Sequence, residues 1–144
     1  MLIDVNVSLG HWPFQKLRPQ TAGELAAHLA AEGIDRALVS PVEAALHPDP
    51  HEYNEPLLEQ VAGEPRLRPV PVINPALPGW RGRLAAYGDA GVPAVKVHPN
   101  YHLYSLDHPE MGALGAALSE RGLPLLLQMR LEDERNQYAA LQIA

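Results

Sequence analysis

The sequence contains no cysteine in its 144 residues. This absence excludes disulfide bonds, cysteine nucleophiles and metal sites that are built on thiolates. Long apolar runs are missing too, since no segment approaches the roughly 20 residues that a membrane-spanning helix needs. The first residues, MLIDVNV, lack the basic start and the long apolar run of a secretory signal peptide. We therefore expect a cytoplasmic protein with no membrane partner.

Positive charge is scarce as well. The sequence has 11 lysine and arginine residues and 17 aspartate and glutamate residues, which gives a formal net charge of −6. No basic stripe or run of lysines stands out. Proteins that bind nucleic acid need such a positive surface to neutralise phosphates, so we expect no nucleic-acid partner. Proline, by contrast, is abundant, and its 15 residues cluster beside the apolar segments as turn residues do.

Five short apolar segments have the length of β-strands, and several are continuous enough to be buried on both faces. They are residues 2–7, 36–40, 67–73, 93–98 and 123–129. Helical patterns separate them at residues 21–33, 54–64, 80–91 and 107–122. Thr21 and Glu24 form a capping box at the start of the first helix, and Gly122 ends the last. In the second helix, Pro56 fits only in the first turn.

The alternation of strands and helices, with a repeat of roughly 30 residues, is typical of βα units in a parallel α/β sheet. One domain, residues 1–144, accommodates all of them. Two architectures fit. A doubly wound sheet of five strands would be complete at this length, whereas a TIM barrel needs eight units and typically about 250 residues. No glycine-rich phosphate loop follows the first strand, so nothing supports the nucleotide-binding version of the doubly wound fold.

Five segments, in sequence order, resemble the amidohydrolase-related proteins. This family is a branch of the metal-dependent hydrolase superfamily, and it includes decarboxylases and lactonases of small carboxylated rings. The segments are IDVNVSLGHWPF (3–14), SPVEAALHPD (40–49), VINPALPGW (72–80), VKVHPNYHLYSLDHP (95–109) and LLLQMRLEDERNQ (125–137). The resemblance implies a TIM barrel, of which this chain would hold about five βα units. It also implies a hydrolase or lyase that acts on a small carboxylated or cyclic substrate.

The usual metal ligands of that family are changed in this sequence. The histidine pair that follows its first strand falls on Asn6 and Ser8, and the histidine after its fifth strand falls on Gln128. Its late aspartate would lie beyond residue 144. Zinc prefers imidazole, thiolate and carboxylate ligands, and neutral amide and hydroxyl oxygens hold it poorly. We therefore expect no metal ligands and no cofactor, with zinc or another divalent metal as the alternative.

His98 and Lys96 are the expected catalytic residues. They lie two residues apart on the fourth strand and so share a face. His98 could act as a general acid or base, and Lys96 could bind a carboxylate or act as a base with a lowered pKa. The structural alternatives are an ion pair between Lys96 and Asp4 and a histidine that caps a loop.

The expected substrate-binding residues follow the carboxyl ends of the strands. They are Asn6, Ser8, Asn100, Tyr101, His102, Gln128 and Arg130. The alternatives are a satisfied polar layer for the first two, a packed surface loop for residues 100–104, and an ion-pair network at a helix start for Arg130. His47, Asp49 and His51 have side chains that bind metals, but we interpret their proline-studded segment as a solvated loop. Trp12 belongs to the turn that shapes the first loop, and we expect it to have a packing role.

Three functions remain open from the sequence. The first is a hydrolase or lyase with a small-molecule substrate. The second is a non-catalytic half-barrel that binds a ligand or assembles with a copy of itself, because a half-barrel would have two open sheet edges. The third is a fragment of a longer barrel protein.

Overall fold

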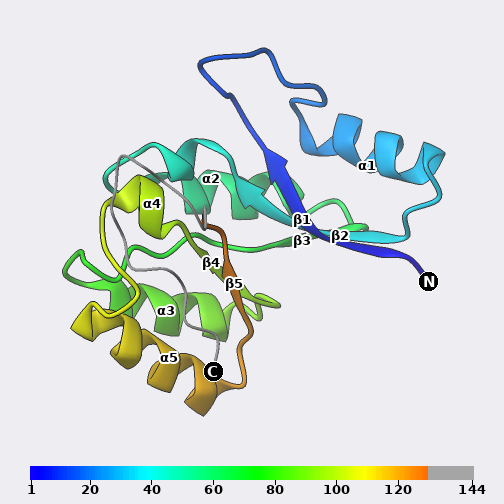
Figure 1. Ribbon diagram of the computed structural model, residues 1–144. Coiled ribbons are helices and arrows are strands. Elements are labelled where there is room, and N and C mark those ends of the chain that lie inside the picture. Colours follow the sequence, from blue (N-terminus) through cyan, green and yellow to red (C-terminus); the bar gives the residue numbers. More distant parts are fainter. Residues whose placement is uncertain (130–144) are drawn as a thin grey trace.

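The structure, a computed structural model, describes residues 1–129 and consists of parallel strands that alternate with helices (Figure 1). The strands are β1 (Ile3–Leu9), β2 (Arg36–Pro41), β3 (Leu67–Pro69), β4 (Val95–Val97) and β5 (Leu125–Leu127). The helices are α1 (Ala22–Ala31), α2 (His51–Val61), α3 (Trp80–Asp89), α4 (Pro99–His102) and α5 (Pro109–Arg121), with a 3-10 turn, η1 (Glu43–Ala45). Each expected strand and helix is present, and α4 and η1 are additional.

The strands pair in the order of the sequence. One sheet has the order β1-β2-β3, a second contains β4 and β5, and every pair is parallel. A single parallel bridge between Val72 and Lys96 joins the two sheets. The third strand is shorter than the expected segment 67–73 because Pro69 and Pro71 have no N–H group to donate to a neighbour. Consecutive pairing is the order of successive units in a barrel, whereas a doubly wound sheet reverses direction beside its first strand.

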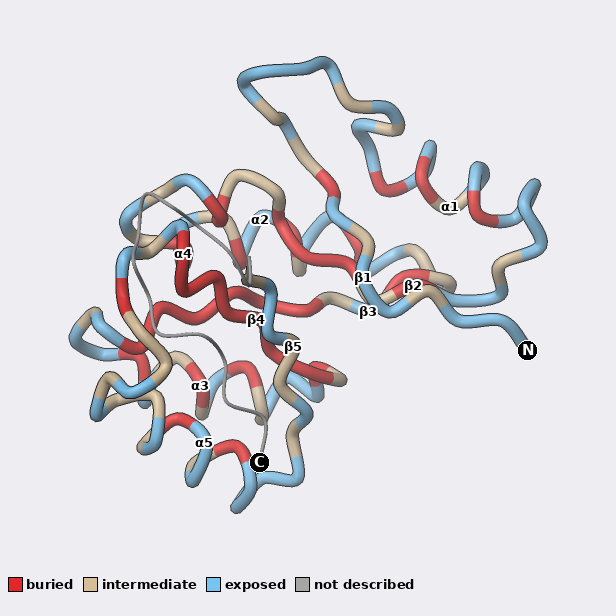
Figure 2. Tube along the Cα trace, in the orientation of Figure 1, coloured by how far each residue is buried: buried red, intermediate tan, exposed pale blue. Residues whose placement is uncertain are grey.

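Two apolar cores stabilise this arrangement. In the first, α1 and α2 pack against β1, β2 and β3; in the second, α3 and α5 pack side by side against β4 and β5 (Figure 1). Buried members of the first core include Leu25, Leu29, Val39, Leu57 and Leu67. Those of the second include Trp80, Leu84, Val97, Leu114 and Leu118. Burial of each large side chain contributes roughly 1.5–3 kcal/mol. Figure 2 shows that burial is greatest along the central strands and lower on the outer faces of the helices.

The helix ends confirm two sequence signals. At α1, the Thr21 hydroxyl accepts the N–H of Glu24 at 3.2 Å, and the Glu24 carboxylate accepts the N–H of Thr21 at 3.3 Å. This is the expected capping box. At α5, His108 Nδ1 accepts the N–H of Glu110 at 3.2 Å, and Gly122 ends the helix with a φ of 63°. Such a positive φ favours glycine.

The start of α2 corrects the sequence interpretation. The helix begins at His51 instead of residue 54, so Pro56 lies inside it, beyond the first turn. The Asp49 carboxylate accepts the N–H of His51 at 3.1 Å, which supports the earlier start. His51 is buried, with 6% of its surface exposed. The expectation of a solvated loop is therefore wrong for His51, whereas His47 and Asp49 lie in a partly exposed bend before the helix.

The path of β1 also departs from simple alternation. Asp4 pairs with Ala37 and Val7 with Val39, so β1 has one residue more than β2 between these pairs. Val5 and Asn6, which alternation would place on opposite faces, therefore line the same cavity.

Every helix within residues 1–129 falls short of the length and apolar content that a bilayer crossing requires.

Candidate functional site

Lys96 is a buried lysine held by neutral oxygens. Only 1% of its surface is exposed. Its Nζ donates to Asn6 Oδ1 at 2.7 Å and to Ser40 Oγ at 3.3 Å. Among residues 1–129 no carboxylate forms an ion pair with it. Because burial disfavours the charged form, the pKa of Lys96 falls from 10.5 to about 8.

The alternative pairing of Lys96 with Asp4 is not found. Asp4 Oδ1 accepts the N–H of Asn6 at 3.0 Å, and the Asn6 side chain reaches the lysine instead. Ser40, the second partner, was not expected from the sequence. The available signal was its place near the carboxyl end of β2, where it pairs with Ser8 of β1 in the sheet. Asn6 and Ser40 thus take the position that a counter-charge would have.

His98 follows β4 directly and precedes the first residue of α4. It is 4% exposed, and its Nδ1 has no hydrogen-bond partner in the described part of the chain. Burial, together with the charges of Lys96 and His102, lowers the pKa of His98 to about 3. The imidazole is therefore neutral near pH 7. A neutral imidazole donates a proton at one ring nitrogen and accepts at the other, as general acid–base chemistry requires.

A cavity of about 280 Å³ lies at the carboxyl ends of the strands, and we call it the His98 cavity. Polar side chains from four segments line it: Ser8 of β1, Gln15 of the loop after β1, His98 and Tyr101 at and within α4, and Gln128 after β5. The remaining lining residues are Trp12, Leu17, Pro41, Val42 and Ala45. The sequence predicts a packing role for Trp12, and the structure places this residue in the cavity wall as well. This volume suits a small ligand.

A second cavity, of about 340 Å³, contains Lys96 in its wall, and we call it the Lys96 cavity. Its other lining residues are Val5, Asn6, Leu125, Leu126, Leu127, Gln128 and Met129. Gln128 lines both cavities. The structure therefore places the two expected catalytic residues in two cavities that share one side chain, and not in a single space.

The remaining expected residues divide into two groups. Asn100 is buried in α4, and His102 places Nε2 2.8 Å from the Ala44 carbonyl oxygen. Neither lines the two cavities. The ring centroids of His102 and His98 lie 5.9 Å apart, so His102 packs edge-on against the expected catalytic histidine. Arg130 lies outside the described residues, as do the acidic residues that follow it.

The histidines near residue 50 have separate partners. Asp49 forms an ion pair with Arg83 at 2.9 Å, and the ring of His51 stacks on Tyr87 with 6.4 Å between the ring centroids. His47 contacts the ring of a neighbouring tyrosine edge-on. Within residues 1–129, no three histidine, aspartate or glutamate side chains gather in a way that could hold a metal ion.

The metal implied by the family resemblance does not fit the residues at the strand ends. The Asn6 side-chain oxygen already accepts from the Lys96 amine. Ser8 and Gln128 offer neutral donor atoms only. A divalent cation at this point would lie close to the positive charge of Lys96, and within residues 1–129 no three histidine, aspartate or glutamate side chains gather there to bind it.

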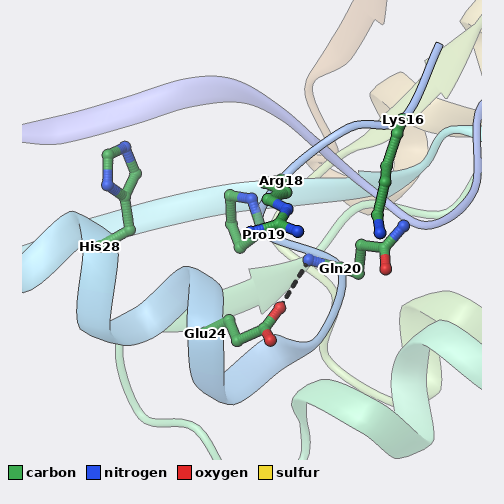
Figure 3. A pocket seen from close by; sticks show the side chains of 6 residues that line it. All are labelled: Lys16, Arg18, Pro19, Gln20, Glu24 and His28. Atoms are coloured by element: carbon green, nitrogen blue, oxygen red, sulfur yellow. Dashed lines mark hydrogen bonds between the residues drawn. The ribbon is translucent and has the colours of Figure 1, made fainter.

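A further hollow, of about 530 Å³, lies at the start of α1 (Figure 3). It is lined by Lys16, Arg18, Pro19, Gln20, Glu24 and His28 and shares no lining residue with the two cavities. Figure 3 shows the Glu24 carboxylate directed at the Gln20 N–H, which donates to it at 2.9 Å. Most of these side chains are exposed, so we interpret the hollow as a solvated surface around the helix cap.

Comparison with known proteins identifies structures of similar fold. The sequence matches no protein-family model and no curated protein. A probable 2-pyrone-4,6-dicarboxylic acid hydrolase from Acinetobacter baumannii, solved with citric acid bound, matches with a TM-score of 0.61 and 14% identity, over 88% of this chain and 48% of that chain. A 2,6-dihydroxybenzoate decarboxylase from Rhizobium matches with a TM-score of 0.64 and 15% identity, over 94% of this chain and 52% of that chain.

Both structures are TIM-barrel members of the amidohydrolase superfamily, and this chain spans about half the length of each. At 14% and 15% identity the likeness concerns the fold alone. It confirms the barrel-type α/β architecture expected from the sequence. Residues 1–129 form consecutive parallel βα units of such a barrel and do not close it.

Proposed function

We propose that the protein is a hydrolase or lyase of the amidohydrolase type that acts on a small carboxylated or cyclic substrate without the usual metal. The observation that carries this proposal is the His98 cavity, where an imidazole, a hydroxyl, a phenol and an amide meet at the carboxyl ends of the strands. Barrel enzymes place their active sites at this end. The two similar structures are described as a hydrolase and a decarboxylase of carboxylated rings, which supports the same class.

In this proposal His98 accepts a proton from the attacking water. A base with a pKa of about 3 is weak, and buried surroundings are the main cause. A carboxylate bound beside the ring would favour the imidazolium ion and raise this pKa toward the working pH. Binding of a carboxylated substrate would thereby make His98 a stronger base, and this would favour the turnover of carboxylated compounds.

The other lining groups would hold the substrate and stabilise charge. Tyr101 and Gln128 carry donor groups that could bind the oxygen anion formed when water attacks a ring ester. Lys96 lies close enough to His98 for its charge to lower the histidine pKa. The same positive charge would attract an anionic substrate to this end of the strands.

Turnover by the full chain tests the proposal. We would assay pyrone carboxylates, other lactones, amides, hydroxybenzoates and oxo acids by chromatography of the products. We expect turnover of at least one carboxylated ring compound, and a loss of about 100-fold or more in kcat/KM for His98→Asn, because general bases typically contribute that much. His28→Asn, which changes an exposed histidine on α1, is the matched control and should keep full activity.

Two outcomes would contradict this function. One is no turnover across the whole panel by a protein whose circular dichroism shows it folded. The other is a His98→Asn variant that works as well as the unchanged protein.

A further inference from the structure

The Lys96 amine has an unusual set of contacts. Asn6 Oδ1 and Ser40 Oγ accept from it at 2.7 and 3.3 Å. Ser40 Oγ donates its own proton to the Val7 carbonyl at 3.4 Å, so toward the lysine it can only accept. A neutral amine has two N–H groups and one lone pair. With both N–H groups held by oxygens, the lone pair of Lys96 is left for a third partner.

The charge state of the amine supports reactivity. Amines attack carbonyl carbon only when they are neutral, and desolvation is one way in which proteins achieve this for lysine. Burial lowers the pKa of Lys96 to about 8. About a tenth of the molecules therefore carry a neutral amine at pH 7, compared with roughly three in ten thousand for an ordinary lysine.

The space beside the amine is suited to a small organic molecule. Apart from Lys96, Asn6 and Gln128, the side chains that line the Lys96 cavity are apolar. They come from β1 and from the segment that includes β5. Neither an acidic side chain nor a second basic one is among these lining residues, so a compact molecule with an uncharged reactive group fits the cavity best.

We propose that the Lys96 amine is a nucleophile that forms an imine with a small aldehyde or ketone in the Lys96 cavity. The Nζ lone pair forms a bond to the carbonyl carbon, and the carbonyl oxygen takes one of the two amine protons. The resulting hydroxyl group then leaves with the second amine proton as one molecule of water, and a C=N double bond remains. No oxidant, reductant or metal takes part. The step is separate from the hydrolysis or decarboxylation proposed above and does not require it.

The chain provides its own control, because it contains two lysines, Lys16 and Lys96. Lys16 is exposed. The full-length protein would be incubated at pH 7 with propanal or pyruvate, reduced briefly with borohydride, digested with a protease that cuts after glutamate, and examined by mass spectrometry. At low conversion we expect the reduced adduct on Lys96 to exceed that on Lys16 at least about tenfold, given the larger neutral fraction expected for a desolvated amine.

Three variants sharpen the test. Lys16→Arg should keep the adduct and Lys96→Met should remove it. Asn6→Asp would place a carboxylate where an amide oxygen now lies 2.7 Å from Nζ. This counter-charge would favour the ammonium form of Lys96. We therefore expect the yield of the reduced adduct on Lys96 to fall at least about tenfold, although the lysine is still present. Because the comparison of Lys96 with Lys16 is made in the unchanged protein, it holds even if a variant fails to fold.

Equal or greater labelling of Lys16 would overturn the inference, and so would an Asn6→Asp protein whose Lys96 is labelled at the original rate. The outcome is independent of the proposed enzyme function. An adduct on Lys96 without turnover of ring compounds would retain the imine and reject the hydrolase. Turnover of a ring compound without an adduct on Lys96 would retain the hydrolase and reject the imine.

Discussion

Two segments with similar sequences have different surroundings in the fold. HPDPHEYN (47–54) and HPNYHLYS (98–105) both begin with a histidine and a proline and both contain a second histidine, an asparagine and tyrosine. In the first, Asp49 pairs with Arg83, and Asn54 donates to the Val72 carbonyl at 2.8 Å. In the second, within the described residues, His98 Nδ1 and the Tyr104 hydroxyl are buried without partners.

The difference comes from the elements packed against each segment. Helix α3 supplies Arg83 and Tyr87 to the first segment, where His51 Nε2 is the side-chain atom that is buried without a partner among the described residues. The second segment lies beside Lys96, whose charge repels a proton on His98, and it borders the His98 cavity. Buried polar groups without partners are costly, so they persist mainly where a ligand or a function requires them. We therefore propose a structural role for the first segment and a functional role for the second.

The largest expected effect is acid destabilisation through one buried histidine in each segment. Burial lowers the pKa of His51 to about 4 and that of His98 to about 3, both below the unfolded value of 6.5. Between these values the unfolded chain binds more protons, so the free energy of unfolding falls as the pH falls below 6.5. We expect a loss of about 1 kcal/mol per pH unit for each histidine, or roughly 3 kcal/mol in total between pH 6.5 and 5.

Urea denaturation at pH 7, 6 and 5 measures this loss. His51→Gln and His98→Gln should each remove a large part of the pH dependence, and His102, whose pKa burial also lowers, should retain a part of it in both variants. A free energy of unfolding that stays constant over this range would show that the two rings are not buried as neutral imidazoles.

The second largest expected effect is the loss of stability when Asn54 is replaced. Asn54 has no exposed surface. It accepts the Val72 N–H at 2.8 Å and donates to the Val72 carbonyl and to the Tyr87 hydroxyl, so it ties α2 to the strand segment beside β4. Asn54→Ala would leave buried backbone groups unpaired, and we expect it to lower the free energy of unfolding by about 2 kcal/mol. Urea denaturation against Gln60→Ala, an exposed control on the same helix, checks this. Equal free energies of unfolding for Asn54→Ala and Gln60→Ala would contradict the structural role proposed for the first segment.

The smallest effect concerns the ion pair of Asp49 and Arg83, whose side chains are 35% and 40% exposed. Half-exposed pairs are screened by solvent, and we expect Asp49→Asn to cost under about 1 kcal/mol. The asparagine oxygen can still accept the N–H of His51, so the start of α2 is retained. Urea denaturation at low and high salt should show that the difference in free energy of unfolding between the unchanged protein and Asp49→Asn becomes smaller at high salt, because salt screens the ion pair. A cost above about 2 kcal/mol would mean that the pair, and not Asn54, holds this segment.

Much of the fold could be predicted from local patterns. Apolar runs located the strands, and the capping box of Thr21 and Glu24 located the start of α1. Three local details were missed. Pro69 and Pro71 shorten β3, the Asp49 carboxylate starts α2 early, and β1 has an extra residue in its register with β2. Each depends on a partner atom or a pairing that the periodicity of a single segment does not contain.

For the candidate site, the residue types and the shared edge of the sheet followed from the sequence, because strand ends in a parallel sheet meet on one side. The pairings did not. Lys96 meets Asn6 across 90 residues of sequence and Ser40 across 56. Whether a buried lysine or histidine is neutralised depends on which distant atoms reach it, and burial then sets its pKa. Composition and spacing therefore place reactive side chains at this edge, and packing between distant segments settles which of them are left without a counter-charge.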